Sequence, residues 1–141
     1  MRYVTGTYAL NLHAPNDTPG DWHYSALNWD AVKTKESSDS VFKDWGLYQT
    51  LVPNHGTMYA ANHLRACLDL LEDGYYSSAQ GMREYFLADD SLTPIVFRKV
   101  WLLNKKAEWQ KIDEFMGREY RCQWLGFKEK MNDQINRNMS K

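Results

Sequence analysis

The chain has 141 residues, 14% of them aromatic, and a formal net charge of −1. This length is that of one domain, and six Trp, nine Tyr and five Phe exclude a disordered chain because they supply apolar surface for a core. The two cysteines lack C-x-x-C spacing, which excludes a disulfide scaffold, and we expect Cys67 and Cys122 to be buried free thiols.

The two parts of the chain differ in charge. Residues 1–93 carry six Lys or Arg and twelve Asp or Glu, whereas residues 94–141 carry eleven Lys or Arg and six Asp or Glu. This asymmetry is typical either of a surface for an acidic partner in the C-terminal third or of two halves of one domain that attract each other.

No part of the sequence predicts a membrane location. No stretch approaches the roughly 18 apolar residues of a membrane span, and the first residues lack the apolar run of a signal peptide. We therefore expect a cytoplasmic protein.

The N-terminal part predicts a small β element. Residues 2–12 are rich in Tyr, Val and Thr, which favours a strand that bends at Gly6. Residues 13–20 contain two prolines and a glycine and predict a loop. Residues 22–29 fit a second strand or a short helix, and the polar segment 33–40 predicts an exposed, mobile loop.

The rest of the chain predicts helices. The apolar spacing of Leu64, Cys67, Leu68 and Leu71 predicts a helix over residues 57–73. Three further segments show helical signals: Ser77 or Ser78 to Leu87, Ser91–Pro94 onwards to Leu103, and an apolar stripe from Trp109 to Ile135. The last stripe is one helix or two, because Gly117 or Gly126 can break it.

These elements predict a mostly helical α+β fold in a single domain, residues 1–141. Residues 1–56 form the β- and loop-rich part, and residues 57–141 form a helical part with four or five helices. The expected core residues are Leu64, Leu68, Leu71, Val100, Trp101, Ile112 and Trp124.

The stretch TPGDWHYSALNW, residues 18–29, gathers two Trp, a Tyr, a His and an Asp. On a strand, Asp21 and His23 would share a face, where a carboxylate can orient an imidazole as a general base. Alternatively, Trp22 and Trp29 anchor the edge of the core, and the polar pair serves only a turn and hydrogen bonds. We expect a mixture, with Trp29 buried and Asp21, Trp22 and His23 at the rim of a functional surface.

Two other histidines are candidates for a site with His23. If the protein is an enzyme, Asp21 and His23 would act as the base pair, and His55 or His63 would be a second polar group. His55 and His63 lack the i, i+4 spacing of two ligands on one helix face, so no metal and no cofactor are expected. Cys67 shares the apolar face of its predicted helix, which favours packing over a reactive thiolate.

Basic and aromatic residues alternate over residues 105–130. Lys111, Arg118 and Arg121 fall mostly on a different helix face from the aromatic stripe, where they could contact phosphates. Acidic residues interrupt this basic face, which is typical of a solvated surface. The three residues are therefore candidate binding residues, but nucleic-acid binding is not favoured.

Five stretches show a resemblance to a known family: GTYALNL, GDWHYSALNW, ANHLRACLDLLEDG, SSAQGM and KIDEFMGREY. Over residues 1 to about 128, the chain resembles a family of small uncharacterised bacterial proteins encoded in mobile or defence-type gene cassettes. The resemblance implies a partner protein and an antitoxin-like role. It supplies no catalytic residue.

The expected function is that of a cytoplasmic interaction protein, such as an antitoxin or inhibitor that covers the surface of a partner protein. Trp, Tyr, Met and Arg are favoured in interface cores, and the chain has more of them than its core obviously needs. Two alternatives stay open: a small hydrolase or nucleotide-processing enzyme that uses Asp21 and His23, and a nucleic-acid-binding protein that uses the helix 105–130.

Overall fold

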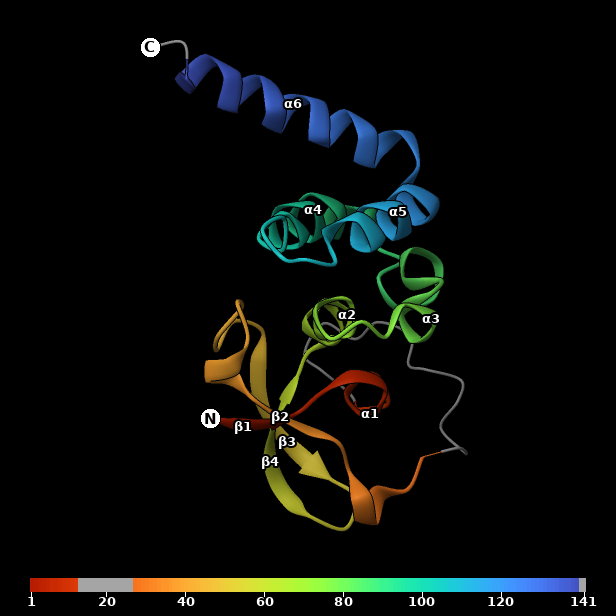
Figure 1. The fold of residues 1–141 in the computed structure, drawn as a ribbon. Helices are drawn as coiled ribbons and strands as arrows, with labels where there is room; N and C mark the ends of the chain where they lie inside the picture. The colour runs from red at the N-terminus through yellow and green to blue at the C-terminus, as the bar shows by residue number, and fades with distance from the viewer. Residues whose placement is uncertain (13–26, 140–141) are drawn as a thin grey trace.

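A four-stranded mixed sheet forms the base of the protein, and helices are stacked on it towards the C-terminus (Figure 1). The computed structural model describes residues 1–12 and 27–139. The strands are β1 (Arg2–Val4), β2 (Thr34–Glu36), β3 (Leu47–Val52) and β4 (Gly56–Ala61). In the order β2-β1-β4-β3, β1 pairs antiparallel with β2 and parallel with β4, and β3 and β4 form an antiparallel hairpin.

The α-helices of the described residues are α1 (Gly6–Leu10), α2 (His63–Glu72), α3 (Tyr76–Ala79), α4 (Thr93–Trp101), α5 (Trp109–Tyr120) and α6 (Cys122–Met139). Short 3₁₀ turns are η2 (Trp29–Ala31), η3 (Ser37–Asp39) and η5 (Asp90–Leu92), and η4 (Met82–Phe86) is a π-helical turn. Helices α1 and α2 lie nearest the sheet, α4 and α5 form the next layer, and α6 lies farthest from the sheet (Figure 1). The α+β fold and the predominance of helix are as the sequence predicts.

The first predicted strand is shorter than expected. Residues 2–12 form strand β1 only as far as Val4, and then helix α1 from Gly6. Gly6 has a positive φ of 61°, which ends the extended backbone and turns the chain into the helix. Ala9 and Leu10 are fully buried, so the apolar residues read as a strand belong instead to a short helix against α2.

The helix predicted over residues 57–73 is wrong in its first part. Residues 56–61 form β4, and α2 begins only at His63. Asn62 caps α2, because its side-chain oxygen accepts a hydrogen bond from the Arg65 backbone N–H at 2.8 Å. The hairpin partner β3 was not predicted, and the boundary expected at residue 56 falls inside the sheet region.

The polar segment 33–40 is not the exposed loop that its composition predicts. Its first part is strand β2, which pairs with β1, and its second part is the turn η3. Ser37 and Ser40 are buried at 3% and 1% exposure. Within this segment, Lys35 and Ser40 hydrogen-bond to Glu72 near the end of α2.

The C-terminal stripe forms two helices. The break is at Arg121, whose φ of 51° ends α5, rather than at either glycine proposed from the sequence. Six of the seven predicted core residues are buried; the exception, Trp101, is half-buried and packs edge-on against Trp109. Among the described helices, none is long and apolar enough to cross a membrane.

Candidate functional site

Three predicted site residues, Asp21, Trp22 and His23, lie outside the described residues. Trp29 of the same stretch is buried, as expected, at 9% exposure. Its ring packs edge-on against Tyr8 of α1, with 5.3 Å between ring centroids. This tryptophan is therefore part of the core edge.

His55 and His63 do not lie together. His55 is in the turn before β4, and His63 follows β4 at the start of α2, so a six-residue strand of roughly 20 Å separates them. His55 Nε2 lies 2.6 Å from the Trp29 carbonyl oxygen, and His63 Nε2 lies 2.8 Å from the Leu12 carbonyl oxygen. Both rings thus bind backbone carbonyl groups in different parts of the fold.

An aromatic cluster attaches α6 to the helical layer. Phe97 of α4 is at its centre, with its ring 5.1 Å from Tyr120, 5.3 Å from Trp124 and 5.4 Å from Phe127. Trp124 also donates a hydrogen bond from Nε1 to Asp113 of α5 at 2.8 Å. These contacts fix the first half of α6, and they use the aromatic stripe that the sequence predicts.

A groove lies between α4 and α6. It encloses about 640 Å³, and its apolar floor includes Pro94 and Phe97 from α4 and Phe127 and Met131 from α6. Basic side chains lie on both sides, Arg98 on α4 and Lys130 on α6. Within the described part of the chain, neither forms an ion pair or a hydrogen bond. Asp90 is the acidic residue of the lining.

The apolar stripe of α6 continues past its packing partners. Met131 is half-buried, Ile135 one turn further is 42% exposed, and Met139 near the end of the helix is 80% exposed. In Figure 1 the C-terminal half of α6 extends beyond α4 and α5. Since exposed apolar surface on a helix marks interaction sites, this face, together with the groove, forms a candidate interaction surface. We call this whole surface, the groove and the exposed α6 face with Ile135 and Met139, the α4–α6 groove.

A second cavity of about 780 Å³, which we call the arginine pocket, lies where α3, η4 and the junction of α5 and α6 meet. Two of the predicted binding residues, Arg118 and Arg121, line it, and Arg83 of η4 joins them. Lys111, the third predicted basic residue, is exposed on α5 but is not part of the lining. The remaining lining residues are Thr7, Ser77, Ser78, Gln80, Gly81, Glu84, Tyr85, Phe86 and Glu119.

The backbone of the arginine pocket is unusual at three places. Arg121 has a φ of 51° and a ψ of −125°, which is strained for a residue with a side chain. Gly81 has a φ of 85°, and a Cβ there would lie 2.6 Å from the Tyr85 ring, so a larger residue would be strained and would displace this ring. The segment from Met82 to Phe86 is a π-helical turn, a feature often found at functional sites.

The guanidinium groups of the arginine pocket are available to a ligand. The side chains of Arg83, Arg118 and Arg121 form no ion pair or hydrogen bond with any other residue that the structure describes. The Arg83 guanidinium lies over the Tyr120 ring, 5.8 Å from its centroid. Burial and the nearby Cys67 raise the pKa of the Tyr120 hydroxyl above its ordinary value, so this ring is a neutral support.

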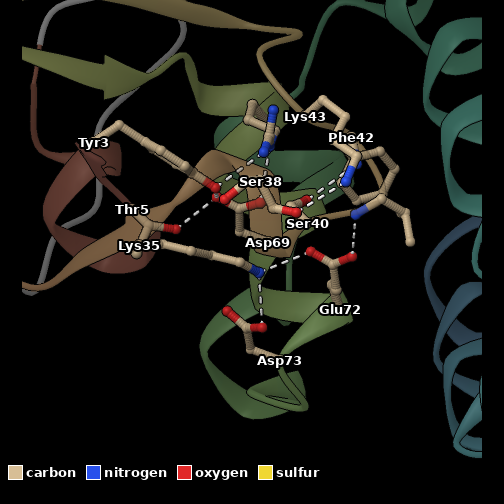
Figure 2. Close-up of polar contacts among 12 residues, drawn as sticks. Tyr3, Thr5, Lys35, Ser38, Ser40, Phe42, Lys43, Asp69, Glu72 and Asp73 are labelled. Carbon is tan, nitrogen blue, oxygen red and sulfur yellow. Dashed lines mark hydrogen bonds and ion pairs between the residues drawn. The ribbon is translucent and has the colours of Figure 1, made fainter. Parts of the chain in front are cut away.

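A buried polar network joins the sheet to α2 (Figure 2). Asp69 accepts hydrogen bonds from the Tyr3 and Thr5 hydroxyls, both at 2.6 Å, and pairs with Arg65 at 2.9 Å. Arg65 also donates to Tyr3 and to the Trp45 carbonyl oxygen. Burial and the Asp69 carboxylate raise the pKa of the Tyr3 hydroxyl, which keeps it a protonated donor.

The second part of this network is at the end of α2. Lys35 of β2 donates to Glu72 at 2.7 Å and to Asp73 at 2.8 Å, and the Val41 backbone N–H donates to Glu72 at 2.9 Å (Figure 2). Burial alone would lower the pKa of Lys35, but the hydrogen bonds to Asp73 and Glu72 outweigh it and raise this pKa. Each charged group of the network has an oppositely charged partner within it, so we assign the network to the stability of the fold.

The thiols differ from the expectation in one respect. Cys67 is fully buried on the apolar face of α2, whereas Cys122 is exposed at the start of α6, so only one of the two is the buried thiol expected. In residues 1–12 and 27–139, no group of three or more His, Cys, Asp or Glu side chains is placed to hold a metal ion.

No family model, no curated protein and no solved structure matches this chain. The resemblance to the bacterial defence-cassette family therefore stays a hypothesis.

Sequence reasoning missed Arg83 and the α4 side of the groove. Arg83 is an isolated basic residue in an acidic part of the sequence, and only the fold brings it to the end of α5. One local signal exists: Gly81 precedes Arg83 and Tyr85, and it interrupts the helix predicted from Ser77 or Ser78 to Leu87, which forms only α3 and the turn η4.

Proposed function

We propose that the protein is a cytoplasmic interaction protein that binds a partner protein in the α4–α6 groove. The observation that carries this proposal is the continuation of the α6 stripe from the buried Trp124 to the exposed Ile135 and Met139. A helix that only completed its own core would end its apolar stripe where its packing partners end.

The shape of the surface favours a helical segment of the partner. A groove between two helices with an apolar floor is the setting in which an amphipathic helix inserts its apolar face. Phe127 and Met131 supply the floor, and Ile135 continues it along α6. With 18 residues, α6 is about 27 Å long, enough for several turns of a partner helix.

Charge specifies the partner further. Arg98 and Lys130 line the groove from opposite sides, and Arg137 follows on the exposed end of α6. A segment with acidic residues at the borders of its apolar face would place carboxylates next to these cations. The proposed occupant is therefore an amphipathic, acidic helix of another protein, and the antitoxin or inhibitor role is the case in which that protein is a toxin.

The test begins with co-purification of the tagged chain from its native host and mass spectrometry of the proteins retained. The candidate partner is then purified and its Kd for the chain is measured by calorimetry. We expect Met131→Asp and Ile135→Asp each to weaken binding tenfold or more, because a carboxylate would be buried in the apolar contact. Growth arrest by the partner alone, relieved when both proteins are expressed, would establish the antitoxin role.

The matched control is Leu125→Asp, the same kind of change at a 50% exposed residue of α6 that does not line the groove. Its Kd should stay within a factor of two of that of the unchanged chain. Equal weakening by all three variants would contradict the groove as the binding surface. A stable dimer of the isolated chain that Met131→Asp converts to a monomer would show that a second copy occupies the groove instead.

A further inference from the structure

The arginine pocket has a chemistry that the proposed function does not use. It shares no lining residue with the α4–α6 groove. Three guanidinium groups from two separate parts of the chain, Arg83 in η4 and Arg118 and Arg121 around the end of α5, line one cavity. Because arginines repel one another, such a grouping without ion-pair partners among the described residues favours an anionic ligand.

Phosphate is an anion that this lining can hold. A guanidinium group offers paired N–H donors that match two phosphate oxygens, and its charge does not depend on pH in the physiological range. Arg118 alone would be unremarkable, since a basic residue in the last turn of a helix also complements the helix dipole. Arg121, the C-cap residue of α5, has the same explanation, but Arg83 reaches the cavity from a separate part of the chain, where its guanidinium lies over the Tyr120 ring.

The lining also limits how much negative charge the ligand can carry. Glu84 and Glu119 line the same pocket, so the formal charge of the lining is only one unit positive. A nucleic-acid strand is normally held by several cations without interspersed carboxylates. A ligand with one phosphate group is therefore favoured over a polyanion.

The rest of the pocket fits a flat ring and a sugar. Tyr85 is 51% exposed in the lining and offers a ring face for stacking. Ser77, Ser78 and Gln80 offer hydrogen-bond donors and acceptors on the α3 side. A volume of about 780 Å³ lies within the range of sites for small organic ligands and far exceeds what a bare phosphate ion needs.

The backbone strain supports a binding role. Arg121 has a φ of 51°, which strains a residue with a side chain but not a glycine. The side chain at this strained position lines the pocket. We propose that the arginine pocket binds a nucleoside monophosphate, with its phosphate on Arg83, Arg118 and Arg121 and its base against Tyr85.

The test is calorimetric titration of the full chain with the four common nucleoside 5′-monophosphates, adenosine, inorganic phosphate and a single-stranded octanucleotide. We expect at least one monophosphate to bind with a Kd below 1 mM, and adenosine and inorganic phosphate to bind at least tenfold more weakly. Failure of all four monophosphates to bind at 5 mM would overturn the proposal. Equal affinity for inorganic phosphate, or tenfold tighter binding of the octanucleotide, would also overturn it.

Variants locate the site. Arg83→Gln and Arg118→Gln should each weaken nucleotide binding tenfold or more, because each removes a charge-assisted hydrogen bond to phosphate. Lys111→Gln removes an exposed positive charge from the same helix outside the pocket and should leave the Kd unchanged. If Lys111→Gln had the same effect as the two pocket variants, general electrostatic attraction would replace the proposed site.

Arg121→Gly separates binding from folding. Glycine relaxes the strained φ, so the Tm of this variant should rise by a few degrees while nucleotide binding falls tenfold or more. A folded Arg121→Gly protein that binds the nucleotide as the unchanged chain does would remove Arg121 from the proposed site.

Discussion

Arg65 and Asp69 form an ion pair one turn apart on α2, 2.9 Å from Nε to Oδ1, with side chains that are 0% and 1% exposed. Asp69 in turn accepts hydrogen bonds from Tyr3 and Thr5, so the pair links α2 to β1 and the residue after it. Two charges in the core are tolerated only where hydrogen bonds satisfy both, as they do here. The pair fixes how the helical part is placed on the sheet.

Asp69→Ala should therefore lower the free energy of unfolding by about 3–5 kcal/mol, because it leaves the Arg65 charge buried without its partner. The measurement is chemical denaturation at neutral pH. Asp73→Ala is the control: this carboxylate is 32% exposed, and Lys35 keeps Glu72 as a partner, so the cost should be at most about 1 kcal/mol.

The double variant Arg65→Met, Asp69→Leu should recover part of the loss, because it removes both charges instead of one. An Asp69→Ala protein that unfolds at the same denaturant concentration as the unchanged chain would contradict the role given to this pair.

The apolar periodicity of α2 predicts that Leu68 is a core residue, and the cost of removing its side chain can be measured. Leu68 is fully buried, so Leu68→Ala should cost about 2–5 kcal/mol through lost burial and the cavity left behind. Leu51→Ala is the matched control on β3, since this leucine is 74% exposed and should lose well under 1 kcal/mol. Similar midpoints of thermal unfolding for both variants would contradict the placement of α2 in the core.

The strongest sequence signals were those with helical spacing. The i, i+3, i+4, i+7 pattern around Leu68 predicted α2, although with a start at residue 57 instead of His63, and the long stripe from Trp109 predicted α5 and α6. These signals are readable from the sequence because a helix that packs along one face repeats its apolar residues every three or four positions, whatever its neighbours are. The break at Arg121 was missed because nothing in the residue type predicts a positive φ.

The sheet was predicted poorly because its strands depend on distant partners. β4 was read as the start of a helix, although its pairing with β3 and β1 makes it a strand. The turn between β3 and β4 carried a signal in Pro53, Asn54 and Gly56, and Asn54 does adopt a positive φ of 67°. Arg83 could not be joined to Arg118 from the sequence, since 34 residues, including the whole of α4, separate them.

Gly46, the residue directly before β3, should tolerate substitution poorly. It has a φ of 79°, and a Cβ there would lie 2.8 Å from the Cβ of Arg65, whose placement the buried ion pair fixes. Gly46→Ala should therefore cost more than the roughly 1 kcal/mol of an unfavourable φ alone.

Gly74→Ala is the control, because it measures the cost of an unfavourable φ without a steric clash. Gly74 has a comparable φ of 85°, but a Cβ there would meet no atom within 4 Å. Equal losses of unfolding free energy in the two variants would mean that the backbone near Gly46 moves away from α2 without cost.

The Glu72 carboxyl should make the protein sensitive to acid. Burial alone would raise the pKa of Glu72, but hydrogen bonds from Lys35, the Val41 N–H and Ser40 outweigh it and lower this pKa from its ordinary value of 4.5. A lowered pKa means that folding favours the ionised carboxylate. The resulting stabilisation is fully present above the unfolded value of 4.5 and is lost as the pH falls through the lower folded value.

We therefore expect the unfolding free energy of the unchanged chain to decrease below a pH of about 4.5, and Glu72→Gln to remove part of this decrease while lowering stability at neutral pH. Denaturant titrations at a series of pH values measure both effects. Glu129→Gln, at an exposed residue of α6, controls for the loss of one negative charge. Parallel curves for the unchanged chain and Glu72→Gln throughout the acid range would show that the hydrogen bonds from Lys35 and Val41 do not favour the ionised carboxylate in solution.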